Sequence, residues 1–471
     1  MAFQSINPAT EAVLATFDQF TPQQTEAALA QADAAFRDWR RRSVGERGGM
    51  MKRVAGLLRE RKSRYAALIT AEMGKPIAQA EAEVEKCAWV CDFYAEHAER
   101  FLAEEPVRTE ARASYVAFEP LGVVLAVMPW NYPFWQVFRF AAPTLMAGNT
   151  AVLKHASNVP QCALAIEEVF RDAGLPRGVF RTLLLPGDAV DEVIADPRVR
   201  AVSLTGSDVT GEKVAAAAGR ALKKTVLELG GSDPFIVLAD ADLAAAAQTA
   251  VKARFQNTGQ SCIAAKRFIV DARVGPQFQE LVLAEIKKLK VGDPMDRSVS
   301  LGPLAREDLR HALAAQVRDS IAHGARLMFG GHAIGEAPGY FYVPTLLVDY
   351  TASSRAAREE VFGPVATLLA AVGEDEAIAL ANATPFGLGA SLWTQDLERA
   401  RELAARIEAG SVFVNAMVAS DPRLPFGGVK RSGYGRELGV FGIHEFVNVQ
   451  TVWMAEGSGR AAERMAGAAV E

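Results

Sequence analysis

Cys262 is the first residue in this sequence that could do covalent chemistry. It lies in "QNTGQSCIAAK", residues 256–266, and is one of only four cysteines in the 471-residue chain. A free cysteine is most often a small buried hydrophobe. Here, however, a helix pattern ends in glycine and amide residues before the cysteine and a strand pattern follows it, and side chains at such junctions can face a cleft. We therefore take Cys262 as a candidate nucleophile, which needs a partner that promotes thiolate formation.

Two further residues could assist such a nucleophile. Glu228, in "VLELGGSDP", directly follows an apolar strand pattern, and burial there would raise its pKa toward the range of a general base. An exposed carboxylate at a strand end is an equal alternative. Asn131, in "VMPWNYPFW", lies in a turn flanked by proline, where its amide could donate to an oxyanion. Ordinary turn formation explains an asparagine there as well.

A third pattern could bind a phosphate. In "AVSLTGSDVTG" a strand pattern ends at Gly206 and Ser207, and a helix pattern follows whose first N–H groups would be free to bind an anion. The segment is not GxGxxG, and a plain connection between strand and helix accounts for it about as well. Lys154, at the end of "TAVLK", could donate to a ribose, although a solvated lysine is the simpler explanation.

The elements that would hold these residues change along the chain. Residues 22–103 show apolar residues at three-to-four spacing, which predicts successive helices. Residues 114–130 alternate and then become continuously apolar, which predicts a strand that enters a buried sheet. Strand and helix patterns then alternate up to "KTVLELGG", and again from "DPFIVLAD" to "SVFVNA". The sequence thus predicts two α/β domains with parallel sheets.

Composition argues against several classes of protein. The chain has 51 basic and 56 acidic residues, a net charge of −5, so it has no cationic excess for nucleic acid. Its apolar runs are shorter than the roughly 18–20 residues that span a bilayer, and residues 1–17 lack a secretory signal pattern. Four cysteines and six scattered histidines predict neither a disulfide framework nor a metal site. We expect a cytoplasmic enzyme that binds neither nucleic acid nor membrane.

Five motifs occur in an order that resembles the NAD(P)-dependent aldehyde dehydrogenase family: "PWNYP", "LELGGSDP", "NTGQSC", "EEVFGPV" and "PFGGVKRSG". The resemblance covers nearly the whole chain and is closest to the bacterial succinate-semialdehyde dehydrogenases. It implies that Cys262 attacks the aldehyde carbonyl and that Asn131 and the Cys262 N–H stabilise the oxyanion. It further implies that hydride passes to a nicotinamide and that Glu228 activates the water that hydrolyses the thioester.

The same resemblance implies a cofactor site. Many NAD-preferring relatives have a glutamate where this chain has Ser157, and a hydroxyl beside Lys154 would accept a 2′-phosphate that a carboxylate would repel. The resemblance therefore favours NADP, with NAD as the alternative. The positions that match cofactor contacts in the family, with Glu360 and Lys154 on the riboses, are Trp130, Lys154, Ser207, Glu360 and Phe362.

Substrate choice would depend on a carboxylate anchor. Arg139, in "FWQVFRF", and Ser420, in "ASDPRLPFGG", match residues that hold the far carboxylate of succinate semialdehyde in those relatives. Better-known members have a second arginine where this chain has Gln256, and the loss of one cation weakens a carboxylate clamp. Arg423 could substitute for it. A structural ion pair is the alternative role for Arg139.

The fold implied by the resemblance has a Rossmann-like cofactor domain, a catalytic α/β domain and small bridging strands. Strands that bridge in this way present edges that need covering, so we expect a homodimer or homotetramer. The expected division is 1–113 and 127–229 for the cofactor domain, 230–424 for the catalytic domain, 114–126 and 444–454 for the bridging strands, 425–443 for a return to the cofactor domain, and 455–471 for a disordered tail.

The expected reaction is the oxidation of succinate semialdehyde to succinate. Within the family, glutarate semialdehyde or a neutral aliphatic aldehyde is an alternative substrate, because Gln256 would relax the clamp. A cysteine hydrolase or acyltransferase without redox chemistry is an alternative from another class, but no histidine lies in a motif beside Cys262 to act as its base. A protein that has lost its activity would be expected to lack Cys262, Glu228 or Asn131, and all three are present.

Overall fold

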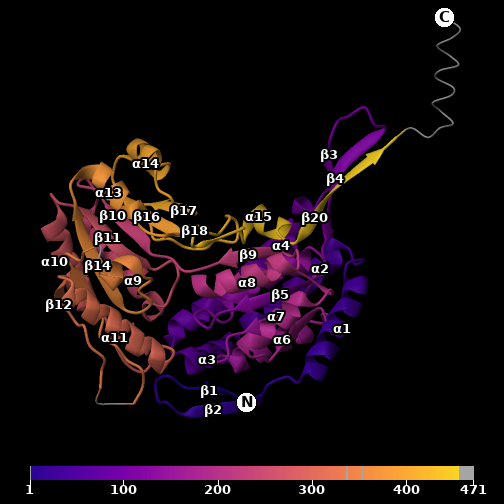
Figure 1. The fold of residues 1–471 in the computed structure, drawn as a ribbon, viewed down its shortest axis with the longest axis horizontal. Helices are drawn as coiled ribbons and strands as arrows, with labels where there is room; N and C mark the ends of the chain where they lie inside the picture. The colour runs from indigo at the N-terminus through magenta and orange to yellow at the C-terminus, as the bar shows by residue number, and fades with distance from the viewer. Residues whose placement is uncertain (1, 336–337, 352–353, 456–471) are drawn as a thin grey trace, which may run out of the picture.

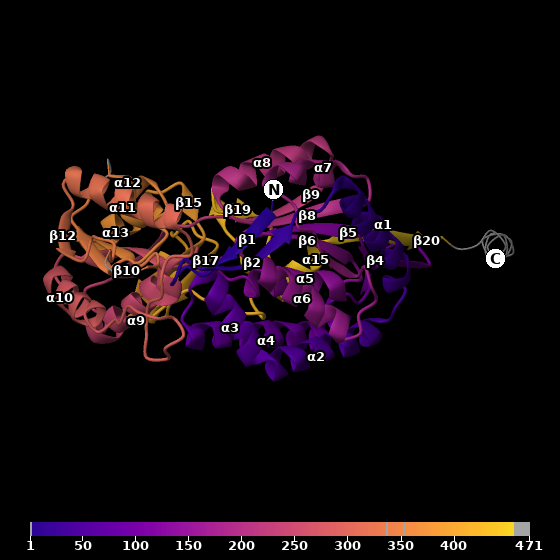
Figure 2. The ribbon, with the colours of Figure 1, turned by 90° about the horizontal axis from the view of Figure 1, so that it is seen from below.

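Two open β-sheets covered by helices form the two lobes of the molecule, and a third, smaller sheet projects from one lobe (Figure 1). The computed structural model describes residues 2–335, 338–351 and 354–455. The predicted α/β class and the two mainly parallel sheets are confirmed. In Figure 2 an N-terminal hairpin, β1 (Ala2–Ile6) and β2 (Val13–Asp18), lies across the front of the molecule. It hydrogen bonds to both lobes, through Ser5 to Gln161 and through Pro8 to Tyr340.

The six-stranded sheet is parallel except at its short edge strand β19. Its strands, in spatial order, are β19 (Gly433–Tyr434), β9 (Lys224–Glu228), β8 (Val199–Thr205), β5 (Val123–Met128), β6 (Thr150–His155) and β7 (Phe180–Thr182). Every residue of β5 is buried, as expected when helices cover both faces. Because side chains alternate along a strand, Val124 packs with one layer of helices and Val123 with the other. The first layer has α5 (Trp135–Met146) and α6 (Pro160–Asp172), and the second has α1 (Pro22–Trp39), α7 (Val190–Ala195) and α8 (Asp208–Arg220).

The seven-stranded sheet is also parallel apart from its edge strand β12. Its strands, in spatial order, are β12 (Arg326–Phe329), β13 (Thr345–Val348), β14 (Val365–Ala371), β11 (Ala265–Asp271), β10 (Asp233–Val237), β16 (Gly389–Trp393) and β17 (Ser411–Val414). Phe235 packs with one layer of helices and its neighbour Ile236 with the opposite layer. The helices are α9 (Leu243–Phe255) and α10 (Gly275–Ile286) on the first face, α13 (Gly373–Asn382) and α14 (Leu397–Ala404) on the second, with α11 (Glu307–Ala322) and α12 (Arg355–Arg358) beside the β13 edge.

The projecting sheet corrects one predicted boundary. Residues 114–126 were expected to form a bridging strand pair, but the structure divides them. β4 (Ala113–Pro120) pairs with β20 (Val447–Met454) and β3 (Glu105–Pro106), whereas β5 belongs to the six-stranded sheet. The physical reason is burial, since β4 is mostly half-exposed and β5 is wholly buried, and Gly122, at φ +140°, redirects the chain between them. The expected disordered tail, 455–471, lies outside the described residues except for Ala455.

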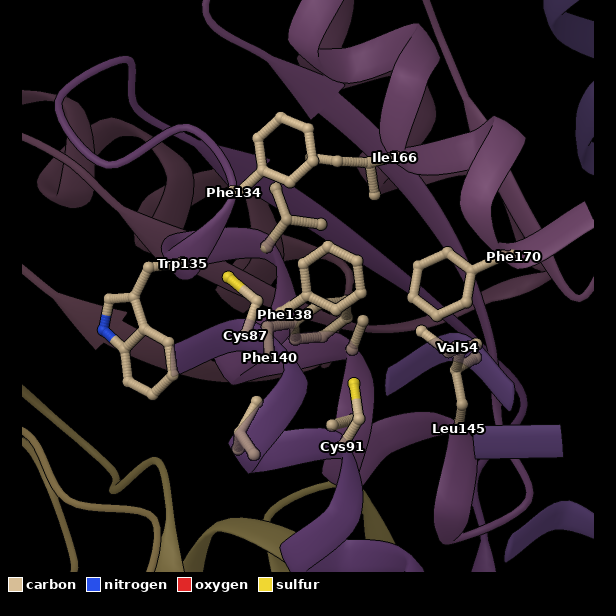
Figure 3. Packing of buried hydrophobic residues seen from close by; sticks show 14 of the residues in the cluster. Val54, Cys87, Cys91, Phe134, Trp135, Phe138, Phe140, Leu145, Ile166 and Phe170 are labelled. Carbon is tan, nitrogen blue, oxygen red and sulfur yellow. The ribbon is translucent and has the colours of Figure 1, made fainter. Parts of the chain in front are cut away.

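The predicted helical region before residue 103 is confirmed. After α1 it continues as α2 (Val44–Glu60), α3 (Lys62–Met73) and α4 (Ile77–Phe101), and these helices pack against α5 and α6. Cys87, Cys91 and Tyr94 of α4 are fully buried, and Figure 3 places both thiols among phenyl rings of this cluster. Trp89 points outward, with 37% of its side chain exposed. No helix in the described ranges is long and apolar enough to cross a membrane.

A buried carboxylate from another helix caps the N-terminus of α5. Glu83 of α4 accepts hydrogen bonds from the backbone N–H groups of Phe134, at 2.9 Å, and Trp135, at 3.0 Å, and forms an ion pair with Lys75. Phe134, the N-cap residue, makes no side-chain capping bond, so Glu83 satisfies the helix terminus from another element. Both members of the ion pair are buried, with side chains 0% and 1% exposed. Because removal of one partner would strand a charge in the interior, this pair holds α5 and the loop before it firmly in place.

We expect Glu83→Ala to lower the free energy of unfolding by about 3–5 kcal/mol, because it leaves the Lys75 ammonium and two backbone N–H groups without partners. Urea unfolding followed by tryptophan fluorescence measures this change. The matched control on the same helix is Glu81→Ala, which breaks an exposed ion pair with Arg297 and should cost about 0–1 kcal/mol. Equal losses in the two variants would contradict a special role for the buried pair.

Candidate active site

The candidate site lies between the carboxyl edge of the six-stranded sheet and the amino edge of the seven-stranded sheet. The chain itself connects these edges, because β9 ends at Glu228 and β10 begins at Asp233. Asn131, which follows β5, donates through Nδ2 to the carbonyl of Gln260 at 3.1 Å. Trp130 meets Phe362 edge-to-face, with ring centroids 5.8 Å apart. Residues from both sheets therefore meet at one place.

The Cys262 loop is held by a strained turn and a buried cation. Asn257, Thr258 and Gly259 all have positive φ, at 56°, 56° and 73°, a conformation that is costly for the first two residues. The Lys266 ammonium donates to the carbonyls of Ser261, at 2.9 Å, and Cys262, at 2.6 Å. The half-buried Cys262 side chain thus projects from a backbone that is fixed on both sides.

The Cys262 thiol is protonated at neutral pH in this environment. Burial raises its pKa to about 12, although the positive charges of Arg139 and Lys266 oppose the increase. The other three cysteines are fully buried, and burial raises the pKa of each well above its ordinary value. Of the four cysteines, all in the described part of the chain, Cys262 is the one that lines the large cavity of the site. The nucleophile therefore needs a base.

Glu228 is buried, which excludes the exposed strand-end carboxylate that the sequence left as an equal alternative. Neither carboxylate oxygen has a hydrogen-bond partner among the described residues, and burial raises the pKa of Glu228 well above its usual range. A side chain at Gly427 would approach Oε1 to 2.6 Å, so the absence of a Cβ there leaves room for the carboxylate. In this conformation Glu228 is not among the described residues that line the Cys262 cavity. Its action on Cys262 or on water would require the side chain to turn.

Asn131 lies against the cysteine loop. Its side-chain nitrogen uses one hydrogen on Gln260, and Asn257 in turn donates to the Asn131 carbonyl at 2.9 Å. An amide nitrogen carries two hydrogens, so one remains for a substrate oxygen. The structure thus brings Asn131 and the Cys262 loop together, and the oxyanion role stays a prediction.

Four of the expected cofactor residues lie at or just after the carboxyl ends of three neighbouring parallel strands. Trp130 follows β5, Lys154 belongs to β6, and Gly206 and Ser207 follow β8. Successive strands lead away from β5 in opposite directions, toward β7 and toward β9, and ligands of open α/β sheets bind at such a reversal. Ser207 Oγ accepts a hydrogen bond from the Thr210 N–H at 3.3 Å and caps α8, so part of this motif is ordinary helix capping.

The chemistry of this edge fits a phosphorylated cofactor. The half-buried Lys154 ammonium has no hydrogen-bond or ion-pair partner in the described ranges, and burial lowers the pKa of Lys154. An anion bound beside it would offset that burial. Ser157 is exposed two residues after β6 ends, where its hydroxyl is free to reach such an anion.

Glu360 and Phe362 approach from the other sheet, just before β14. Glu360 Oε1 accepts from the Gly231 N–H at 3.1 Å and pairs with Lys266 at 3.0 Å. The same lysine therefore links the expected ribose ligand to the Cys262 loop. Sequence reasoning missed Lys266, whose signal was a charge four residues after the cysteine in an otherwise apolar strand pattern. No group of three or more metal-ligating side chains occurs in the described chain.

A cavity of about 860 Å³ contains Cys262 and three of the four expected substrate residues, Arg139, Gln256 and Ser420. Arg423 does not line it. Its guanidinium binds Asp421 at 2.6 and 2.9 Å and is 67% exposed, so the prediction that Arg423 replaces the missing arginine is corrected. An acid two residues away in its own loop captures this charge outside the cavity.

Arg139 combines the two roles that the sequence left open. It lines the cavity, but Nε forms an ion pair with buried Glu437 and Nη2 donates to Thr205 Oγ1 at 3.3 Å. Its guanidinium also lies 4.6 Å from the centroid of the Phe426 ring. The structural ion pair therefore exists, and it uses part of the charge that was expected to hold a substrate carboxylate.

A second cation in the cavity, Lys86 of α4, was missed in the sequence. Its Nζ donates to Ser420 Oγ at 2.7 Å and lies 4.4 Å from the centroid of the Trp135 ring. The helical pattern around "EVEKCAWV" indicated only a half-buried face. A lysine between buried Val84 and Cys87 was the available signal, but nothing local indicated that a cavity lay beside it.

Comparisons with known proteins identify the family of this chain. The model of the aldehyde dehydrogenase family matches residues 1–452. A probable succinate-semialdehyde dehydrogenase [NADP(+)] of Synechocystis sp. is 54% identical, over 97% of this chain and 100% of the relative. Succinate-semialdehyde dehydrogenase [NADP(+)] 1 of Mycobacterium tuberculosis is 51% identical, over the same shares. The crystal structure of succinic semialdehyde dehydrogenase from Streptococcus pyogenes in complex with NADP+ is 40% identical, covers 97% of this chain and 100% of that one, and superimposes with a TM-score of 0.94. This chain is a member of the aldehyde dehydrogenase family.

Proposed function

We propose that this enzyme oxidises succinate semialdehyde to succinate with NADP, or less effectively with NAD. The observation that carries the proposal is that one cavity holds Cys262 together with Arg139 and Ser420, a nucleophile with groups that can bind a carboxylate. Relatives whose names state this activity and NADP, at 51–54% identity over nearly the whole chain, support it.

The proposed reaction has two stages, formation of a thioester on Cys262 and hydrolysis of that thioester. Glu228, turned toward the cavity, takes the proton of Cys262 and releases it to solvent. Sγ adds to the aldehyde carbon, and the oxygen that becomes negative accepts hydrogen bonds from Asn131 Nδ2 and the Cys262 N–H. A nicotinamide cofactor held along the edge that carries Lys154, Ser157 and Ser207 would supply the acceptor for the hydride of the aldehyde carbon. Glu228 then takes a proton from water, the resulting hydroxide attacks the thioester, and the Cys262 thiolate leaves as the acid forms. A buried Glu228 of raised pKa is a stronger base than an exposed glutamate.

The two sheets have separate roles in this proposal. The six-stranded sheet and the return segment 425–443 bind the cofactor, and the seven-stranded sheet carries the cysteine. We also propose a cytoplasmic homodimer or homotetramer. The outer strand of the projecting sheet, β20, exposes Val449 and Trp453, at 61% and 51% of their surfaces, and an uncovered edge of this kind favours pairing with another copy. Four free cysteines suit a reducing compartment.

Turnover of charged and neutral aldehydes tests the reaction. We expect kcat/KM with NADP to be at least about tenfold higher for succinate semialdehyde than for butanal, because one charged contact is worth at least ~1.5 kcal/mol. Absorbance of the reduced nicotinamide measures both rates. Equal kcat/KM values would favour the neutral-aldehyde alternative. A higher kcat/KM for glutarate semialdehyde would make that longer aldehyde the substrate. Ester hydrolysis without nicotinamide reduction would favour the cysteine hydrolase.

We expect Ser157→Glu to lower kcat/KM for NADP by on the order of 10- to 100-fold, because a carboxylate would repel the 2′-phosphate. The value for NAD should change much less. Ser157→Ala is the matched control, which removes one hydrogen bond and should cost about two- to tenfold with NADP only. Steady-state kinetics with both cofactors measures these ratios. An unchanged preference in Ser157→Glu would place the 2′-phosphate elsewhere or remove NADP from the proposal.

We expect the rate of iodoacetamide alkylation to rise about tenfold per pH unit between pH 7 and 10, because the pKa of Cys262 is raised and its thiolate fraction keeps growing over that range. Mass spectrometry should find only Cys262 modified in the native protein, since the other three thiols are buried. Cys262→Ser should therefore prevent labelling altogether. A rate that levels off below pH 8 would mean that a partner deprotonates the resting thiol.

A further inference from the structure

Lys86 contributes an unpaired charge to the cavity that holds Cys262. It lies on α4, one turn after Glu83, and its half-buried side chain extends along the wall formed by Trp135. Its one hydrogen bond in the described chain goes to Ser420 Oγ, at 2.7 Å, and no carboxylate of the described residues lies within ion-pair distance of Nζ. An ammonium taken from water in this way is unfavourable unless an anion joins it.

Four other cations near this cavity already have acidic partners. Arg139 pairs with Glu437, Lys266 with Glu360 and Lys75 with Glu83. Arg423 pairs with Asp421 outside the cavity. Lys252 also lines the cavity, but it is exposed and therefore solvated. Among the cations that line the cavity in the described chain, Lys86 is therefore the one that is partly buried and still available to bind an anionic ligand.

The hydrogen bond between Lys86 and Ser420 places two hydrogen-bond donors, an ammonium and a hydroxyl, side by side. An ammonium has three N–H groups and no acceptor, so Ser420 Oγ must be the acceptor in this bond. The serine hydroxyl hydrogen is then free to donate elsewhere, and so are the remaining N–H groups of Lys86. An N–H and an O–H from adjacent atoms suit the two oxygens of a carboxylate.

We propose that Lys86, together with Ser420, binds the carboxylate at the far end of the aldehyde substrate and replaces the cation that Gln256 does not supply. This proposal rests on the proposed function, because it names the residue that selects the acid over a neutral aldehyde. Arg139, held by Glu437, then supports the electrostatic field of the cavity and packs against Phe426. A residue of α4, in the layer of helices, therefore determines the preference of the enzyme for an aldehyde that carries a carboxylate.

The kinetic experiment compares Lys86→Met, which keeps an unbranched side chain without charge, with Lys86→Arg, which keeps the charge. We expect Lys86→Met to raise KM for succinate semialdehyde at least about tenfold, to leave its kcat within about threefold, and to remove most of the preference over butanal. Lys86→Arg should restore much of that preference. Lys252→Met is the control for a general loss of positive charge, and it should keep the wild-type preference.

A pH profile gives a readout that a merely structural role would not change. Burial and the nearby charge of Arg139 lower the pKa of Lys86 to about 8, so its cation is complete below that pH and is lost as the pH rises through it. Asp421, Glu83 and Cys87, which also face Lys86, oppose the decrease. The ratio of KM for succinate semialdehyde to KM for butanal cancels the titration of Cys262. This ratio should rise above pH 8 in the wild type and stay level in Lys86→Arg.

A binding measurement separates this proposal from the proposed function. Succinate should slow alkylation of Cys262 by iodoacetamide in the wild type and not in Lys86→Met, whereas 1,4-butanediol should protect neither. If the wild type prefers succinate semialdehyde and Lys86→Met keeps both that preference and the protection, the Lys86 proposal is wrong and the function stands. If the wild type shows no preference but succinate protects it in a Lys86-dependent way, the anchor stands and the substrate is wrong. Thermal unfolding of each variant confirms that it is folded.

Discussion

The buried ion pair between Lys75 and Glu83 is the constraint on which the geometry of this site depends. Glu83 accepts hydrogen bonds from the N–H groups of Phe134, the N-cap residue of α5, and of Trp135, its first residue. The Lys75 ammonium lies 3.6 Å from the centroid of the Tyr132 ring, in the loop that begins with Asn131. Because the charges have no access to water, neither residue can move without leaving the other unpaired. The pair thereby fixes the start of α5, which carries Arg139, and the turn that presents Asn131. Its acidic member, Glu83, lies one turn before Lys86 on α4.

Lys266 plays the corresponding part on the other side of the cleft. It holds the carbonyls of Ser261 and Cys262 and pairs with Glu360, which reaches back to the Gly231 N–H between the two sheets. One ammonium thus links the nucleophile, the expected ribose ligand and the connection from β9 to β10. A buried ammonium that contacts two carbonyl oxygens and one carboxylate is satisfied in the interior, so it orders the loop without attracting substrate.

The cations in and around the site have different roles because their partners differ. Arg139, Lys266 and Lys75 each have a carboxylate partner, and they act mainly by fixing the polypeptide. Arg139 and Lys266 also oppose the increase in the pKa of Cys262. Lys86 and Lys154 have none in the described chain, and they lie at the two places where anionic groups of substrate and cofactor are expected. Pairing within the protein distinguishes structural cations from those that remain for ligands.

The sequence alone determined the α/β class, the mainly parallel sheets, the helical region before residue 103 and the identity of the candidate nucleophile, base and oxyanion donor. Those features depend on local periodicity and on motifs of contiguous residues. Tertiary structure alone decided the division of 114–126 between two sheets, the exclusion of Arg423 from the cavity, the capture of Arg139 by Glu437, and the entry of Lys86 beside Ser420. The division of 114–126 depends on which strands each half meets and on the burial of β5. The positions and partners of Arg423, Arg139 and Lys86 depend on where their charged groups lie relative to the cavity, because the pairing energy of a charge is determined by its spatial neighbours and its burial.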